Sequence, residues 1–203
     1  MSSKHRPFLV VVSSASGAGK TSICRGVLAR DRKVAYSVSA TTRPRRKGEV
    51  HGRSYYFYSE QEFLKRLRQD ELLEHARVYD HFYGTPKAHV LGCFRKGKDV
   101  IADLDVQGMR SCKKALPGTV GIFITTPDLE DLSRRLRRRG TDSTEVIRRR
   151  QAESKAELAA IPEFDYLVVN DRLERAIGDV LAVIRAERLG TGRIQPDKRP
   201  KGE

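Results

Sequence analysis

A lysine and a threonine follow a glycine-rich turn near the start of this 203-residue chain, a combination that can bind phosphate. Residues 13–21 have the sequence Ser-Ser-Ala-Ser-Gly-Ala-Gly-Lys-Thr, after a short apolar run and before a helical stretch. Backbone N–H groups of such a turn, with the positive end of the next helix, bind a triphosphate. Lys20 would reach the β- and γ-phosphates, and the Thr21 hydroxyl would take a Mg²⁺ position. We assign to this nucleotide site Ser14, Ala15, Ser16, Gly17, Ala18, Gly19, Lys20, Thr21 and Ser22.

The turn departs from the usual pattern at one position. Ser14 stands where the pattern G-x-x-x-x-G-K-[ST] has its first glycine. If the backbone had to adopt a positive φ there, a serine would cost about 1 kcal/mol, which a folded protein tolerates. A small-residue turn with an accidental Lys-Thr pair is the competing interpretation.

A second cluster, in residues 39–49, has the sequence Ser-Ala-Thr-Thr-Arg-Pro-Arg-Arg-Lys-Gly-Glu. Arginine forks bind phosphate oxygens bidentately, and hydroxyl groups add further donors. Taken alone, the cluster is equally compatible with a solvated basic turn.

Taken with the rest of the chain, this cluster resembles the acceptor motif of guanylate kinases, Ser-x-Thr-Thr-Arg-x-x-Arg-x-Gly-Glu. The matching residues are Ser39, Thr41, Thr42, Arg43, Arg46, Gly48 and Glu49, followed by Gly52 and Tyr55. Later matches, in the family's order and spacing, are Leu73-Glu74-x-Ala76, Tyr83-Gly84-Thr85, Asp103-Leu-Asp105-x-Gln107-Gly108 and Val169-Asn170-Asp171. The resemblance covers about residues 7–189.

The resemblance implies an enzyme that transfers the γ-phosphoryl group of Mg·ATP to GMP, and to dGMP, in purine nucleotide metabolism. It places the GMP phosphate on Arg43, Arg46, Tyr55 and Tyr83. It places the guanine on Glu74, Ser39 and Thr85, and Glu49 also belongs to the GMP set. A carboxylate suits guanine, because N1–H and the 2-amino group lie side by side and adenine has no such donor pair.

Two aspartates, Asp103 and Asp105, follow a predicted core strand. In the family, one lies toward the Mg²⁺ and its water shell and the other toward the guanine amino group. We assign Asp103 to the metal and Asp105 to the guanine, although the sequence leaves the order open. A pair of turn-forming acids is the alternative.

Arginines are concentrated in residues 126–155, which hold eight of them. Phosphoryl transfer needs positive charge around the γ-phosphate, and a closing lid can supply it. By resemblance, Arg135, Arg139 and Arg150 act in such a lid, and Arg135 and Arg139 also bind ATP. With Lys20 of the phosphate loop and Arg43 of the acceptor motif, these three make up the expected catalytic set. The other five arginines are expected on the solvated surface. Asn170 would contact the adenine of ATP.

The elements that must position these residues alternate between strands and helices. Strands are predicted over 8–13, 36–40, 54–58, 100–106, 120–125 and 166–169. Helices are predicted over 20–30, after the capping box at Ser59, after Thr85-Pro86, over 126–140 and 143–160, and after residue 171. This alternation predicts an α/β fold with a parallel core sheet.

The resemblance refines that prediction to a single three-layer P-loop kinase domain over residues 1–203. Its core would comprise residues 7–36, 91–125 and 156–189. A small mixed α/β GMP-binding lobe would span 37–90 and a helical lid 126–155. Residues 190–203 are expected to form a frayed basic tail.

Composition restricts the function classes. Lys and Arg number 40 against 26 Asp and Glu, a net charge of +14, which attracts nucleic acid or small phosphorylated ligands equally. The apolar run at residues 8–12 is too short for a membrane span or signal peptide, and the three cysteines have neither disulfide nor zinc spacing. We therefore expect a soluble cytoplasmic protein, monomer or homodimer, with no membrane or nucleic-acid partner.

Three other functions remain to be weighed. A non-catalytic guanylate-kinase-like interaction module typically lacks a working phosphate loop, whereas this chain has Lys20 and Thr21. A kinase for another phosphorylated small molecule is disfavoured by Glu74 and the complete arginine motif. An RNA-binding protein would need an aromatic RNP-like segment, and alternation on a strand explains the aromatic run at residues 55–58.

Overall fold

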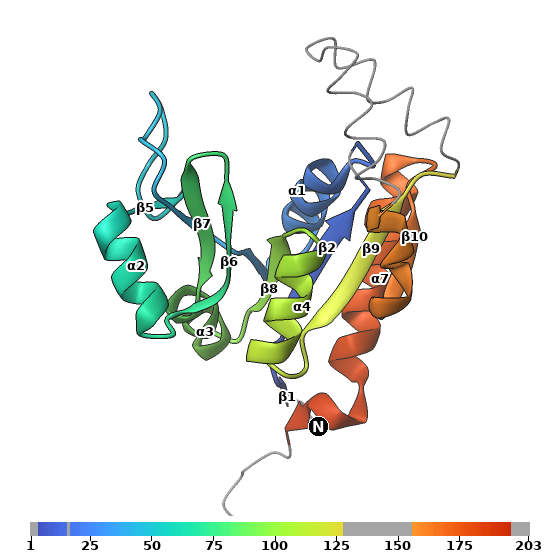
Figure 1. Ribbon diagram of the computed structural model, residues 1–203. Coiled ribbons are helices and arrows are strands. Elements are labelled where there is room, and N and C mark those ends of the chain that lie inside the picture. The colour runs from blue at the N-terminus through green and yellow to red at the C-terminus, as the bar shows by residue number, and fades with distance from the viewer. Residues whose placement is uncertain (1–3, 16, 128–155, 196–203) are drawn as a thin grey trace, which may run out of the picture.

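Five parallel strands form the central sheet of the computed structural model, which describes residues 4–15, 17–127 and 156–195 (Figure 1). The strands lie in the order β10-β9-β2-β8-β3. Their bounds are β2 Leu9–Ser14, β3 Val34–Tyr36, β8 Asp99–Asp103, β9 Val120–Thr125 and β10 Tyr166–Val169. Strands β9 and β10 have the predicted bounds, because each is a short apolar run. The sheet buries nearly all of β9, whereas β10 lies at its edge and buries only Val168.

Helices cover both faces of this sheet and make it the middle of three layers. Successive residues of a strand point to opposite faces, so Val10 and Val12 of β2 pack on one side and Leu9 and Val11 on the other. On the first side lie α1 (Lys20–Arg30) and α7 (Leu173–Leu189). On the second lie α3 (Lys87–Arg95) and α4 (Val106–Ala115). This is the α/β fold that the sequence predicts.

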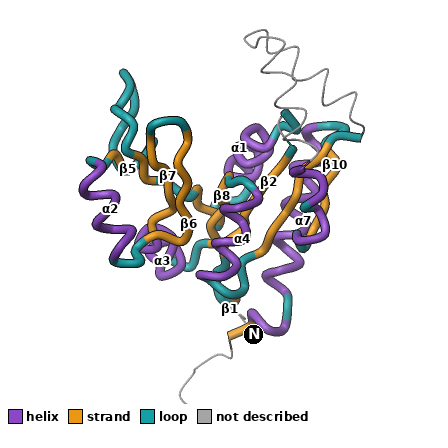
Figure 2. Tube along the Cα trace, in the orientation of Figure 1, coloured by secondary structure: helices purple, strands orange, loops and turns teal. Residues whose placement is uncertain are grey.

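A second sheet forms a smaller lobe beside the core (Figures 1 and 2). Its order is β5-β4-β7-β6, with β4 parallel to β5 and the other pairs antiparallel. The bounds are β4 Ala40–Thr41, β5 Tyr56–Phe57, β6 Leu72–Val78 and β7 His81–Pro86, and α2 (Glu60–Arg68) packs on the sheet through Phe63. The Ser59 hydroxyl accepts a hydrogen bond from the Glu62 N–H (3.1 Å), so the predicted helix cap is confirmed. These strands lie within residues 37–90, and the lobe boundaries themselves remain a prediction.

Several elements differ from the prediction. The β6–β7 hairpin and α4 were not expected, and residues 36–40 are divided between the two sheets. Strand β8 ends at Asp103 rather than residue 106, because Asp105 caps α4: its Oδ1 accepts a hydrogen bond from the Gly108 N–H (2.7 Å). Pro86 ends β7 and caps α3 instead of opening it.

The chain after residue 189 is more ordered than predicted. A 3₁₀ turn, η2 (Thr191–Arg193), leads into β11 (Ile194–Gln195), which pairs antiparallel with β1 (Lys4–His5). The Arg193 guanidinium pairs with Glu187, donates to the Gly118 carbonyl and stacks 4.2 Å from the Phe8 ring centroid. These contacts hold the first part of the expected tail against the core, so fraying from residue 190 is wrong for residues 190–195.

The predicted helix and lid over residues 126–155 lie almost entirely outside the described residues, as do Arg135, Arg139 and Arg150.

Residues 161–163 form a second 3₁₀ turn, η1 (Ile161–Glu163). In the part of the chain that the structure describes, no helix has the length and apolar character needed to cross a membrane.

Candidate active site

The phosphate loop connects β2 to α1 and takes its shape from two glycines. Gly17 and Gly19 have φ values of 96° and 95°, in the left-handed region that favours glycine. Ser14 is the last residue of β2 and does not have a positive φ; Asp70 and Tyr79 are the non-glycine residues that do, among those described. The serine at residue 14 therefore fits as strand, without the strain that a left-handed backbone would impose. Ser16 lies outside the described residues.

Asn170 holds the far side of this loop. It follows β10 and is 4% exposed, and its Nδ2 donates a hydrogen bond to the Ala18 carbonyl (2.7 Å). A Cβ at residue 19 would lie 2.5 Å from the same Nδ2, so glycine is required there for space as well as for φ. In this structure the Asn170 side chain supports the loop, and its contact with adenine remains a prediction.

Lys20, Thr21 and Asp103 meet where β2 and β8 end side by side. The Lys20 Nζ lies 2.9 Å from Asp103 Oδ1 and donates to the Leu104 carbonyl (3.0 Å). The Thr21 hydroxyl donates to Asp103 Oδ2 (3.1 Å). A carboxylate and a hydroxyl are oxygen ligands of the kind Mg²⁺ prefers, so these two residues fit that ion.

The described residues contain no group of three or more His, Cys, Asp or Glu side chains that could hold a metal ion. Mg²⁺ at phosphate sites commonly uses one or two protein ligands and completes its shell with substrate phosphates and water. The Thr21–Asp103 pair has that character.

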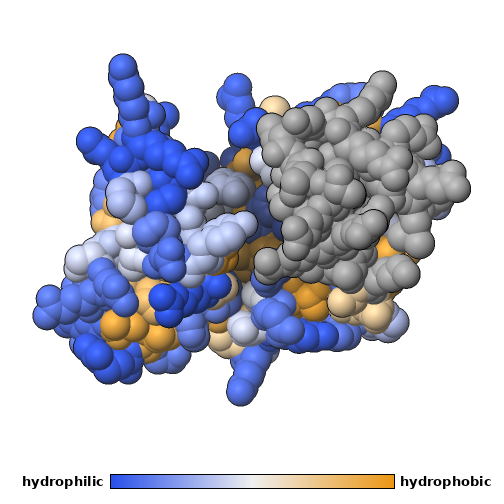
Figure 3. All heavy atoms as spheres, turned by 45° about the horizontal axis from the view of Figure 1, so that its top comes forward, coloured by the Kyte–Doolittle hydropathy of each residue, from blue (hydrophilic) through white to orange (hydrophobic). Residues whose placement is uncertain are grey.

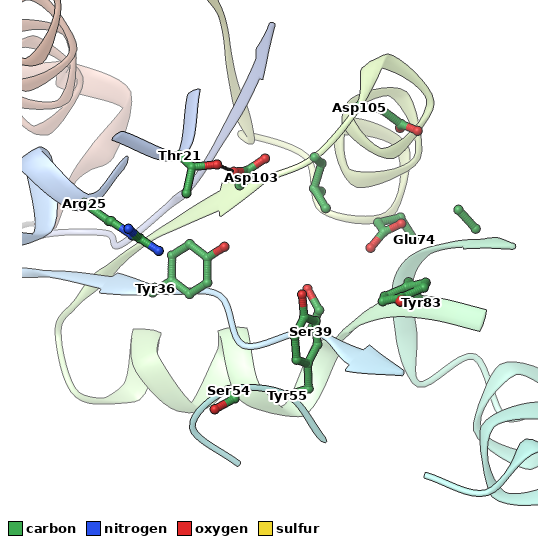
Figure 4. Close-up of a pocket in the computed structure, with 13 residues that line it drawn as sticks. Thr21, Arg25, Tyr36, Ser39, Ser54, Tyr55, Glu74, Tyr83, Asp103 and Asp105 are labelled. Carbon is green, nitrogen blue, oxygen red and sulfur yellow. Dashed lines mark hydrogen bonds between the residues drawn. The ribbon is translucent and has the colours of Figure 1, made fainter. Parts of the chain in front are cut away.

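A cavity of about 440 Å³ opens beside this triad, in the hollow between the small lobe and the core (Figures 3 and 4). Its wall brings together seven of the predicted substrate and metal residues. They come from α1, β6, β7 and the end of β8, from the positions just before β4 and β5, and from the connection after β8. They are Thr21, Ser39, Tyr55, Glu74, Tyr83, Asp103 and Asp105.

Glu74 lies at the buried end of the cavity. It comes from β6, is 9% exposed, and its Oε1 accepts a hydrogen bond from the Thr85 hydroxyl (2.7 Å). Burial raises the pKa of Glu74 to about 7; the Thr85 hydrogen bond opposes that shift and the nearby Asp105 charge adds to it. Thr85 is fully buried, so it orients the carboxyl group from behind.

Arg43 and Arg46 lie in the loop after β4, and neither lines this cavity. Arg43 Nη2 pairs with Glu49 Oε1 (2.7 Å), and its guanidinium lies 5.5 Å from the Tyr55 ring centroid. Glu49 Oε2 accepts from the Arg46 backbone N–H (2.7 Å), and the hydrogen bond from Arg43 lowers the pKa of Glu49. Glu49 thus fixes the loop that carries both arginines.

The model of the guanylate kinase family matches residues 6–187 of this chain. The chain belongs to the guanylate kinase family. A guanylate kinase of Carboxydothermus hydrogenoformans is 45% identical over 94% of this chain and 93% of its own length. One from Thermotoga maritima is 46% identical over 92% of this chain and 90% of its own. A crystal structure of guanylate kinase from Anaplasma phagocytophilum is similar with a TM-score of 0.73 and 30% identity, covering 95% of this chain and 92% of that one.

Three polar residues in the wall of this guanylate kinase cavity were not found from the sequence: Arg25, Tyr36 and Ser54. Arg25 comes four residues after Thr21 on the same helix, a spacing that places the two side chains on one face. That spacing is a sequence signal that could have identified Arg25. Tyr36 and Ser54 carry no comparable signal, because only the fold brings the end of β3 next to the small lobe.

Proposed function

We propose that this chain transfers the γ-phosphoryl group of Mg·ATP to GMP, giving ADP and GDP. One observation carries the proposal: a phosphate loop with Lys20, Thr21 and Asp103 faces a cavity whose far end holds the buried carboxyl group of Glu74. The first part suits a triphosphate donor and the second suits a guanine acceptor. Membership of the guanylate kinase family supports the same reaction.

Selection of guanine follows from the position of Glu74. An ionised carboxylate can accept hydrogen bonds from guanine N1–H and its 2-amino group together, with Ser39 and Asp105 nearby in the cavity wall. Adenine would leave a buried acceptor unpaired, at a cost of about 1–3 kcal/mol or more. GMP and dGMP share this base, so both are proposed acceptors.

On the donor side, residues 14–22 would surround the ATP phosphates, with the Lys20 ammonium on the transferring phosphate. Thr21 and Asp103 would hold Mg²⁺, which when bound neutralises charge on the phosphate oxygens. The hydrogen bond between Thr21 and Asp103 keeps these two oxygen ligands together.

The acceptor phosphate is already an anionic nucleophile, so the reaction needs neither a covalent intermediate nor a strong base. Catalysis then consists of positioning the two nucleotides and neutralising their charge. Arg43, Arg46, Tyr55 and Tyr83 are the proposed phosphate ligands, and Arg135, Arg139 and Arg150 are the proposed lid cations. We also propose a cytoplasmic location for the protein.

A coupled assay of ADP release tests the proposal directly. ATP and Mg²⁺ would be supplied with GMP, dGMP, AMP, CMP or UMP in turn. We expect turnover with the two guanine nucleotides and little with the other three. Faster turnover with AMP or a pyrimidine nucleotide would contradict the assignment of Glu74 as the guanine ligand. If none of the five nucleotides were phosphorylated, the proposed kinase activity itself would be contradicted.

A further inference from the structure

Arg25 lies in the wall of the acceptor cavity, although no part of the family motif contains it. It is in the second turn of α1, one helical turn after Thr21, and its side chain is exposed. Figure 4 shows its guanidinium directed toward the Tyr36 ring, on the opposite side of the cavity from Glu74. Thr21 and Asp103 lie between these two ends.

The charges around the cavity make this position significant. Three carboxylates, Glu74, Asp103 and Asp105, contribute to its wall, and among the described lining residues the single cation is Arg25. Without Arg25, the lining of the cavity would present no positive charge of its own to the phosphate of a nucleotide whose base lies at Glu74.

Arg25 is also available for a ligand. Asp103 already pairs with Lys20 and Thr21, and Asp105 caps α4. Within the described parts of the chain, the Arg25 side chain has neither an ion pair nor a hydrogen bond, whereas Arg30 on the same helix pairs with Glu174. A guanidinium without a protein partner, facing a cavity, can form bidentate hydrogen bonds to phosphate oxygens at little rearrangement cost.

Tyr36 lines the cavity beside Arg25 and offers a second polar group there. Burial and the Asp103 charge raise the pKa of the Tyr36 hydroxyl, and the Arg25 charge opposes that shift. The hydroxyl therefore stays protonated at physiological pH and can donate to the same anion.

We propose that Arg25 binds the phosphate group of the acceptor nucleotide, on the side that faces the phosphate loop. This inference rests on the proposed function and adds a ligand to the arginines of the acceptor motif. Arg43 pairs with Glu49 and approaches from beyond Tyr55, whereas Arg25 is the cation that lines the described cavity itself, one helical turn from Thr21 of the phosphate loop. Positive charge there also screens the repulsion between the two nucleotides as they approach.

The test compares GMP with guanosine, which has the same base and no phosphate. Dissociation constants of both ligands would be measured by calorimetry for the wild type, Arg25→Ala, Arg25→Lys and the control Arg30→Ala. We expect Arg25→Ala to weaken GMP binding roughly 10- to 100-fold and to leave guanosine binding unchanged. Arg25→Lys should recover part of the loss because it keeps the charge, and Arg30→Ala should match the wild type.

Steady-state kinetics separate the acceptor from the donor. Arg25→Ala should raise the KM for GMP while the KM for ATP stays close to that of the wild type, with an unchanged melting temperature. Equal losses for GMP and guanosine, no loss for either, or an effect confined to ATP would each overturn the inference. The wild type in the same assay reports on the proposed function separately, because its failure to phosphorylate GMP would refute the reaction whatever the variants do.

Discussion

If Glu74 binds guanine as proposed, its protonation state couples guanine binding to pH. Its pKa of about 7 lies above the usual carboxyl value because the side chain is buried. The ionised form accepts both guanine donors, whereas the protonated form presents a donor of its own to them. Acid therefore removes the binding-competent form, and affinity for GMP should increase as pH rises through 7.

We expect kcat/KM for GMP to fall as pH decreases below about 7, by up to roughly tenfold per pH unit. A pH profile between 5.5 and 9 measures this. Glu74→Gln is the matched control, because a glutamine side chain cannot ionise. Its kcat/KM should be lower at every pH and should not change around pH 7. The change caused by ionisation of the GMP phosphate, at a pH of about 6, should remain. Superimposable profiles for the two proteins would show that Glu74 does not control the pH dependence.

Lys20 has a different proposed role, in which its ammonium acts on the transferring phosphate. Lys20→Ala should lower kcat by roughly 10²–10³-fold, as expected for loss of one preorganised charge at the reacting group. Single-turnover measurements at saturating ATP and GMP would quantify the loss. Lys65→Ala, in the exposed part of α2, is the control and should keep normal turnover. A Lys20→Ala enzyme with the wild-type rate would remove this residue from the chemistry.

The elements position these residues through close contacts between helices. Gly26 of α1 faces Ile177 of α7, and a Cβ at residue 26 would lie 2.2 Å from Ile177 Cδ1 and 2.8 Å from Cγ1. Because Ile177 is buried in the core, the two helices would have to separate. The N-terminus of α1 carries the phosphate loop, so this packing also sets the position of the donor site.

Gly26→Ala should therefore destabilise the fold by about 1–3 kcal/mol. Gly178→Ala is the matched control on α7: no heavy atom lies within 4 Å of its added Cβ, and alanine should stabilise that helix by up to about 1 kcal/mol. Chemical denaturation of both variants gives the comparison. Equal stabilities would mean that α1 and α7 tolerate a wider separation.

Helices and strands could be predicted from the sequence where their apolar residues form a regular local pattern. Strands β9 and β10 are uninterrupted apolar runs, so periodicity located them. In β6, however, polar and charged residues such as Glu74, His75 and Arg77 interrupt the apolar pattern, because the middle of the strand lines the cavity and its last residues are exposed. Helix α4 contains Gly108 and Ser111, which are poor helix formers, and depends on the Asp105 cap and on burial of Met109 and Cys112. Tertiary contacts of that kind have no local sequence pattern.

The residues of the candidate site could be predicted from the sequence better than the β6–β7 hairpin, which carries two of them. Motif residues gave Glu74, Tyr83 and Asp105 without any strand prediction for residues 72–86, and the structure places all three around one cavity. Arg25 was missed because a single basic residue on a helix resembles any solvated residue until the opposite wall is known.

At the scale of the whole molecule, one buried ionic network connects distant parts of the chain. Asp99 at the start of β8 is fully buried; its Oδ2 pairs with Arg188 Nε (2.7 Å) and its Oδ1 lies 3.0 Å from His5 Nε2. Arg188 also pairs with Asp31 (2.6 Å). Burial would raise the pKa of Asp31, but the hydrogen bond and charge of Arg188 outweigh it and lower that pKa. The network joins α7, the end of α1 and the N-terminal strand.

Arg188→Ala should destabilise the protein by about 3–5 kcal/mol, since it leaves a buried carboxylate without its guanidinium. Arg185→Ala, an exposed position one turn earlier on α7, should change stability by less than about 0.5 kcal/mol. Thermal unfolding at neutral pH measures both. Equal melting temperatures for the two variants would show that the Asp99 carboxylate does not depend on Arg188 for its stabilisation.

The pairing of β1 with β11 also has a practical consequence. Lys4 and Gln195 are Cα partners in this ribbon, which lies at the bottom of Figure 1, while β2 runs upward to its end at Ser14, where the phosphate loop begins. A bridge of a few residues could therefore join the two strands, and new termini could open at the exposed turn around Gly97. Such a circular permutant could be tethered through its linker to a solid support, with the nucleotide entrance facing solution.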